Sequence, residues 1–137
     1  MNYLLDTNVL SEIRKRDRAV PGVQAWFAAT PGTNMFTSVL VLGELRRGVE
    51  LTRRRDPESA TTLDRWVRGV EESFAHHLLP IDEHVADQWG RLNVPDPLPV
   101  IDGLSSATAL VHDMTVVTGN VRDIGRTGCR VLNPFTG

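Results

Sequence analysis

The sequence is poor in cysteine and lysine and has no long hydrophobic run, which excludes several common kinds of site. Cysteine occurs once in 137 residues, at Cys129, which excludes an internal disulfide and a zinc site built from cysteines. We interpret Cys129 as a small apolar residue buried in the core. Lysine also occurs once, at Lys15, beside 14 arginines. No apolar run is long enough to cross a membrane, and the N-terminal run stops at Asp6 before it could form a signal-peptide core. We therefore expect a cytoplasmic protein with no membrane segment.

Several catalytic signatures are missing as well. The histidines do not show the H-E-x-x-H spacing of a zinc site, and no serine stands in a G-x-S-x-G turn. Neither a G-x-x-x-x-G-K nor a G-x-G-x-x-G loop is present to cradle phosphates. Nucleotide-cofactor chemistry is therefore disfavoured. We interpret the histidines as surface or polar core residues: His76, His77, His84 and His112.

The composition is that of an ordinary globular chain. Hydrophobic residues make up 41% and charged residues 23%, a balance that argues against disorder, and no segment repeats. A chain of this length can bury one proper hydrophobic core, so we expect a single domain over residues 1–137.

Short apolar runs alternate with longer helical ones, which predicts an α/β fold with a central, mostly parallel five-stranded sheet. Strands are expected at 2–6, 35–37, 77–79, 115–118 and 130–132. Helices are expected at 8–16, 21–29, from just after 38 toward 55, 59–74, 82–92 and 101–111. Thr37 and Ser38 are candidate caps for the third helix. The segment T-G-N-V-R-D indicates a loop that leads into one further helical turn.

Four acids stand at the edges of apolar stretches: Asp6, Glu44, Asp102 and Asp123. Burying an ionised carboxylate there is costly unless it is paired, protonated or bound to metal. Three of the four fall where parallel strands end or a following helix begins, which is where open α/β sheets bind ligands. Glu44 joins them if its helix starts at the same sheet edge.

Carboxylates gathered at one edge repel each other, and a hard cation such as Mg²⁺ or Mn²⁺ relieves that repulsion with oxygen ligands and bound waters. Any one acid alone is better explained as a helix cap or an ion pair. The joint pattern indicates a metal site whose shell a phosphate diester would complete.

Basic residues cluster although the net charge is only -2. Arginine forks match phosphate geometry, so the clusters fit a nucleic-acid path, but they fit solvated helix faces equally well. The sequence leaves both interpretations open. The clustered residues are Arg14, Lys15, Arg16 and Arg18 in one group, and Arg46, Arg47, Arg53, Arg54 and Arg55, extended by Arg65 and Arg68, in the other.

Several motifs together resemble the PIN-domain proteins of the VapC/FitB toxin type. They are D-T-N-V-L-S-E, T-S-V-L-V-L-G-E-L, D-G-L-S-S-A-T-A-L, T-V-V-T-G-N-V-R-D and V-L-N-P-F, in the family's order from Tyr3 to Phe135. The resemblance implies a three-layer α/β/α architecture.

The resemblance also implies roles for residues. Asp6, Glu44 and Asp102 match the acids that hold the catalytic Mg²⁺ or Mn²⁺, and Asp123 matches the later acid that completes the site. Supporting positions are Thr7, Asn8, Ser38, Thr118 and Asn120. The chain departs from the family at Gly119, where a basic residue is common, and at Ile124, where an aromatic is common. The first departure removes one partner for a substrate phosphate.

The implied function is a metal-dependent endoribonuclease toxin that hydrolyses phosphodiester bonds of structured RNA, such as transfer or ribosomal RNA. A cognate VapB-type antitoxin would neutralise it, and a homodimer is expected. Two rivals come from other classes. A phosphoryl-accepting receiver domain needs a lysine late in the chain, and the only lysine is Lys15. A catalytically silent module, which binds a basic partner segment or RNA without cleavage, stays open.

Overall fold

Five parallel strands form the centre of the fold in this computed structural model, which describes residues 1–136. The predicted strands are all present, with ends within one residue of those expected. They are β1 (Tyr3–Leu5), β2 (Met35–Ser38), β3 (Leu78–Leu79), β4 (Thr115–Val117) and β5 (Val131–Leu132), in the order β3-β2-β1-β4-β5. β1 is central, with Tyr3 in register with both Met35 and Thr115. Gly137, the last residue of the predicted domain, lies outside the described residues.

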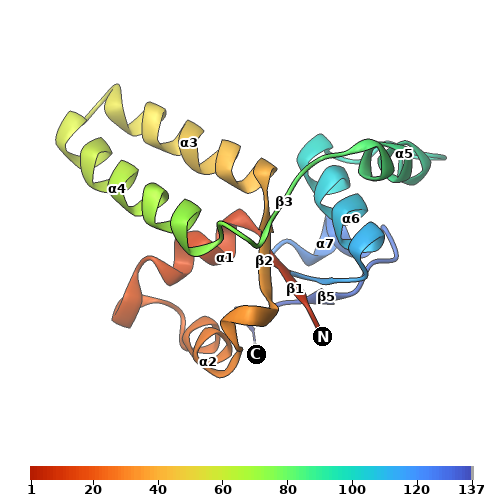
Figure 1. Cartoon of the computed structure of the whole chain (residues 1–137), viewed down its shortest axis with the longest axis horizontal. Coiled ribbons are helices and arrows are strands. Elements are labelled where there is room, and N and C mark those ends of the chain that lie inside the picture. Colours follow the sequence, from red (N-terminus) through yellow and green to blue (C-terminus); the bar gives the residue numbers. More distant parts are fainter. Residues whose placement is uncertain (137) are drawn as a thin grey trace.

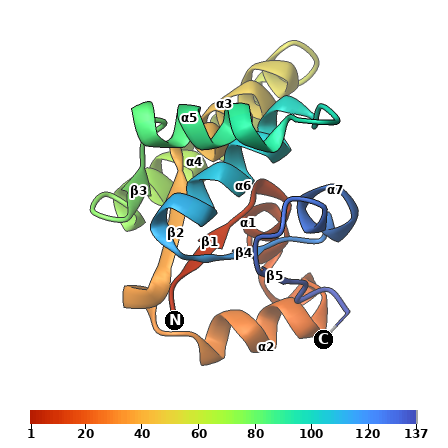
Figure 2. The same ribbon diagram turned by 90° about the vertical axis from the view of Figure 1, so that its right-hand side faces the viewer.

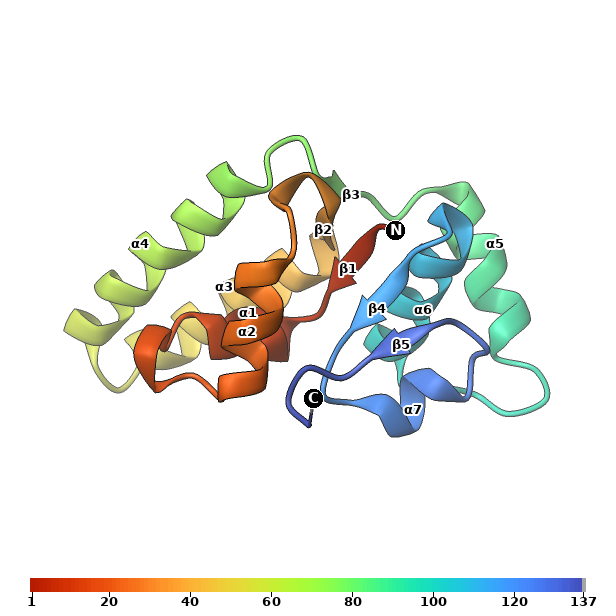
Figure 3. The same cartoon turned by 90° about the horizontal axis from the view of Figure 1, so that it is seen from below.

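Helices cover both faces of this sheet. Figure 3 shows α1 to α4 on one side and α5 to α7 on the other, which confirms the predicted three-layer arrangement. Their bounds are α1 (Thr7–Ile13), α2 (Pro21–Ala29), α3 (Val39–Arg53), α4 (Pro57–Ser73), α5 (Glu83–Leu92), α6 (Val100–His112) and α7 (Val121–Gly125). Within residues 1–136, no helix is both long and apolar enough to span a membrane.

Strand alternation divides the core between the two faces. Leu5 packs with Val9 and Val67 in a cluster on the side of α1 to α4. Its neighbour Leu4 points to the opposite face, as successive strand residues do, and packs with Ala109 of α6. Figure 2, seen from the side of α5 and α6, shows α6 crossing in front of the central strands. Cys129 is buried in this second cluster, as predicted.

Helix ends explain where the sequence prediction was inaccurate. α1 stops at Ile13 rather than at 16, and Arg16 beyond it has a positive φ of 54° that no α-helix accommodates. α4 begins at Pro57, two residues before the predicted start, because Asp56 caps it and proline suits a first helical position. Ser38 occupies the N-cap position of α3, but its side chain makes no capping hydrogen bond.

Three arginines of the second basic cluster approach one acid within the hairpin of α3 and α4, which extends away from the sheet in Figure 1. Asp64 on α4 lies 2.9 Å from Arg46 Nη2 and 3.4 Å from Arg68 Nε, and Arg53 Nη2 approaches it at 3.8 Å. The hydrogen bond from Arg46, followed by that from Arg68, holds the pKa of Asp64 below its ordinary value, although partial burial opposes this. Arg46 and Arg53 therefore join α3 to α4, whereas Arg68 pairs with Asp64 within α4.

Candidate functional site

Asp6 is the fixed centre of the predicted acidic site. It directly follows the central strand β1, its backbone N–H donates to Val117 O at 3.0 Å, and it is 9% exposed. As the N-cap of α1, its Oδ1 accepts the backbone N–H of Thr7 at 3.0 Å. Its Oδ2 accepts the hydroxyl of Thr118 at 2.8 Å. The orientation of the Asp6 carboxylate is thus determined by β1, by the start of α1 and by Thr118 at the end of β4.

Asn8 and Thr118 connect the ends of β1 and β4. The Asn8 Nδ2 donates to Asp6 Oδ2 at 3.3 Å and to Thr118 Oγ1 at 3.1 Å. The Asn8 Oδ1 in turn accepts the backbone N–H of Gly119 at 3.0 Å. Thr118 Oγ1 also accepts the backbone N–H of Asn120 at 3.0 Å. The two predicted supporting side chains therefore link three separate segments around Asp6.

Glu44 reaches the same place from α3. That helix starts directly after β2, which pairs with β1 in parallel, so both elements leave the sheet at one edge. Thr7 Oγ1 donates to Glu44 Oε1 at 2.5 Å. This contact, across 37 residues of sequence, fixes one oxygen of the second acid beside the first.

Asp102 enters from the first turn of α6, where Asn120 Nδ2 donates to its Oδ2 at 3.0 Å. Partial burial raises the pKa of Asp102, and the negative charge of Asp6 raises it further. The hydrogen bond from Asn120 opposes this shift, while the more weakly acting charges of Asp123 and Glu44 add to it. The other three predicted acids thus act on the Asp102 carboxyl group through their charge.

Three of the four acids line a single open cleft of about 540 Å³. Thr7, Asn8 and Asn120 share this lining, and Val100 and Ile101 from the start of α6 form an apolar side. Asp123 is not among the lining residues. It lies in the first turn of α7, and its negative charge contributes to the raised pKa of Asp102.

The donor chemistry of the cleft fits a hard cation. Carboxylate, hydroxyl and amide oxygens line it, and Mg²⁺ and Mn²⁺ prefer such ligands and retain several waters. Among residues 1–136, no three His, Cys, Asp or Glu side chains already stand together as a closed metal-ligand set. The acids thus line one cleft without forming a closed ligand set.

Ser38 does not give the support predicted for it. Its side chain is buried, and its hydroxyl has no hydrogen-bond partner in the described structure. The adjacent Thr37 donates instead to Leu5 O at 2.9 Å, which ties β2 to β1. Sequence reasoning also missed the bond between Thr7 and Glu44, because no local spacing signals a contact between segments so far apart.

Comparison with known proteins places this geometry in a family. A profile of the PIN domain matches residues 3–128. Ribonuclease VapC14 of Mycobacterium tuberculosis (strain CDC 1551 / Oshkosh) is 39% identical over 66 residues, which span 48% of this chain and 63% of that protein. The match thus covers less than two thirds of this relative.

Two solved structures have the same fold. The structure of FitAcB from Neisseria gonorrhoeae is similar over 97% of this chain and 98% of that one, with 29% identity and a TM-score of 0.87. A toxin-antitoxin complex from Klebsiella pneumoniae is similar over 97% and 98%, with 20% identity and a TM-score of 0.72. Because the family profile extends over nearly the whole sequence, the chain belongs to the PIN domain family.

Proposed function

We propose that this protein is a metal-dependent endoribonuclease of the VapC/FitB toxin type, which hydrolyses phosphodiester bonds of structured RNA such as transfer or ribosomal RNA. One observation carries the proposal. Asp6, Glu44 and Asp102, from three separate elements, line one cleft at the carboxyl edge of the sheet in a PIN domain. The name of the ribonuclease relative supports the type of reaction.

Asp6 and Asp102 are the side chains we assign as direct ligands of Mg²⁺ or Mn²⁺. Glu44 is assigned as a further ligand or as the group that orients the attacking water, and Asp123 as a contact for a second ion or its waters. When bound, such an ion makes a coordinated water more acidic and stabilises the charge that develops on the phosphate. No side-chain nucleophile is required.

The neighbouring polar side chains prepare this site by holding particular oxygens. Thr118 and Asn8 both donate to Asp6 Oδ2, Thr7 donates to Glu44, and Asn120 donates to Asp102. Each bond restricts one carboxylate before any ligand arrives, which lowers the ordering cost of binding. Because the pKa of Asp102 is raised, this group becomes a full anion only at a pH above that of an ordinary aspartate.

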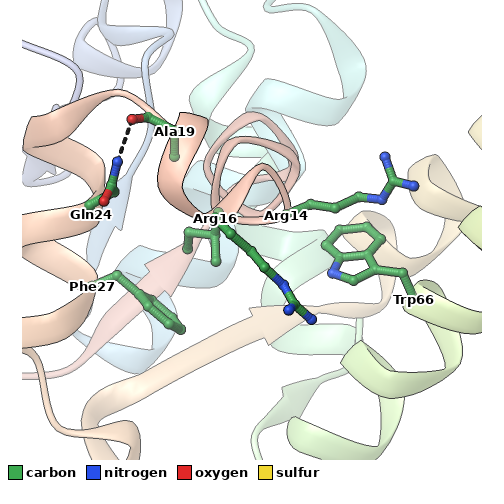
Figure 4. Close-up of a pocket in the computed structure, with 7 residues that line it drawn as sticks. Arg14, Arg16, Ala19, Gln24, Phe27 and Trp66 are labelled. Carbon is green, nitrogen blue, oxygen red and sulfur yellow. Dashed lines mark hydrogen bonds between the residues drawn. The ribbon is translucent and has the colours of Figure 1, made fainter.

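A VapB-type antitoxin is the partner we assign, and a homodimer is the expected assembly. A surface groove of about 370 Å³ between α1, α2 and α4 suits a partner segment. Figure 4 shows Phe27 and Trp66 on either side of it, with Arg16 between them and Arg14 beside Trp66. The Arg14 guanidinium carbon lies 5.8 Å from the centroid of a Trp66 ring. Apolar walls with cations between them fit a segment that carries both apolar and acidic side chains.

Cleavage of purified total RNA tests the proposed activity. We expect fragments with Mg²⁺ or Mn²⁺, none with EDTA, and none with Asp6→Asn or Asp102→Asn. Asp87→Asn is the matched control, because Asp87 is an exposed acid on α5 that pairs with Arg91. Intact RNA at high protein concentration, with antitoxin binding retained, would instead identify a catalytically silent module.

A further inference from the structure

The C-terminal segment lies against the loop that carries Thr118 and Asn120. Phe135 is partly buried against the core on the side of α1 to α4. A Cβ atom added to Gly119 would stand 3.0 Å from Cδ2 and 3.1 Å from Cε2 of the Phe135 ring. The φ of Gly119 is not in the left-handed region, so its backbone conformation does not call for glycine. A side chain here would instead displace the ring by a few tenths of an ångström.

The position of this ring is set by the sheet. Thr118 N donates to Leu132 O at 3.0 Å, which joins the end of β4 to β5. The chain then turns at Asn133, whose Oδ1 accepts the backbone N–H of Phe135 at 3.0 Å. Phe135 therefore returns over the residue that immediately follows Thr118.

Gly119 is also one step from the acidic cleft. Its backbone N–H donates to Asn8 Oδ1, which leaves the Asn8 Nδ2 to donate to Asp6 Oδ2 and Thr118 Oγ1. If the Gly119 peptide moves, the Asn8 amide loses the bond that fixes its orientation, and Asp6 loses a donor. A displacement of the ring is thus passed to the central carboxylate through one peptide and one side chain.

We infer that Phe135 is a positioning residue for the acidic site. Its ring holds the Gly119 peptide against Asn8 and so orients Asp6, and the absence of a side chain at 119 lets the ring pack this closely. Its metal-binding consequence rests on the proposed function, whereas its structural consequence does not.

The structural consequence is measured in the metal-free protein by hydrogen exchange of the Gly119 amide. Phe135→Leu removes the ring while keeping an apolar side chain, and we expect exchange to quicken by about tenfold as the loop opens locally. Phe36→Leu is the matched control, because Phe36 is a partly buried phenylalanine that stacks on His77. Unchanged protection of Gly119 in Phe135→Leu, or equal loss in both variants, would overturn the inference.

A double-mutant cycle measures the consequence for the site, with Mn²⁺ alone as the probe in calorimetry. We expect Gly119→Ala to weaken Mn²⁺ binding by about fivefold, and to have no further effect once Phe135→Ala has removed the ring. An equal effect of Gly119→Ala in both backgrounds, or no effect in either, would contradict the coupling. If Phe135→Ala does not fold, Phe135→Leu takes its place in the cycle. Should the wild-type protein bind no Mn²⁺, the proposed function fails, and the exchange measurement still decides the role of Phe135.

Discussion

Two aspartates in this protein experience opposite environments. Asp64, in the hairpin of α3 and α4, is surrounded by Arg46, Arg53 and Arg68, and its pKa is lowered by the hydrogen bond from Arg46 above all. Asp102, in the cleft, has its pKa raised by burial first and then by the negative charge of Asp6. Within residues 1–136, arginines form ion pairs with the hairpin acid, whereas Asp6, Glu44 and Asp102 in the cleft form none.

The difference shows what each region is built for. Asp64 in the hairpin forms ion pairs with arginines of the same chain, so it stabilises the fold and needs no ligand to balance its charge. The cleft acids are restrained by hydroxyl and amide donors, which orient carboxylates without neutralising them. A site that orients like charges and leaves them uncompensated is prepared for a cation from outside the chain.

The largest expected effect separates these two acids by activity. Asp102→Asn should reduce RNA cleavage by at least about 10²-fold, because loss of a ligand exceeds the 10–100-fold typical of losing a group behind one. Asp64→Asn should leave cleavage within about twofold, because Asp64 is assigned no part in the chemistry. Initial rates with Mn²⁺ measure both. Equal losses in the two variants would remove the distinction between the regions.

A smaller effect tests whether orientation by neutral donors matters in the cleft. Thr118→Val keeps the shape of the side chain but removes the hydroxyl that donates to Asp6 Oδ2 and accepts from Asn8 and Asn120. We expect Mn²⁺ affinity to fall by about 10-fold or more. Thr108→Val is the control, because the hydroxyl of Thr108, within α6, donates to Leu104 O. Titration calorimetry that finds both variants equal to wild type would show that this network is dispensable.

The pH dependence should distinguish a raised from a lowered pKa. Mn²⁺ binding requires Asp102 as an anion, so affinity should keep rising with pH above the group's ordinary value of 3.8. Calorimetry of the wild-type protein across pH measures this rise. A profile that is already level near the ordinary aspartate value would contradict the raised pKa.

The smallest expected effects are opposite changes in the metal-free melting temperature at neutral pH. Asp102 carries an unfavourable charge once the pH exceeds its raised pKa, so Asp102→Asn should raise the melting temperature. The pKa of Asp64 is lowered in the folded protein, so its contribution to stability is present at pH values above its ordinary pKa of 3.8. That contribution is lost only as the pH falls through the folded pKa. At neutral pH, Asp64→Asn should therefore lower the melting temperature. Thermal denaturation followed by circular dichroism gives both signs. Shifts in the same direction would refute the contrast.

The sequence predicts much of the sheet and the acidic edge, for physical reasons. Buried parallel strands are short apolar runs between helices, so each strand was placed to within one residue. Asp6 and Asp102 were assigned to one edge because parallel strands end there together. The meeting of Glu44 with Asp6 depended on where α3 starts, which the end of β2 determines.

Contacts between side chains of elements far apart in the sequence cannot be predicted from the pattern of residues within each element. Three such features depend on how the elements pack against each other. They are the hydrogen bond from Thr7 to Glu44, the Ser38 hydroxyl without a hydrogen-bond partner in the described structure, and the packing of Phe135 on Gly119. Periodicity describes one element at a time and carries no information on these distances. The second basic cluster shows the same limit, because the pairing of Arg46 and Arg53 with Asp64 depends on how α3 packs against α4.

Uptake of Mn²⁺ by the purified wild-type protein at neutral pH is the most direct test that the cleft binds a cation. Isothermal titration should show saturable binding below millimolar concentration, lost in Asp6→Asn and in Asp102→Asn and retained in Asp64→Asn. Absence of binding at millimolar Mn²⁺, or binding that survives both cleft substitutions, would contradict the account.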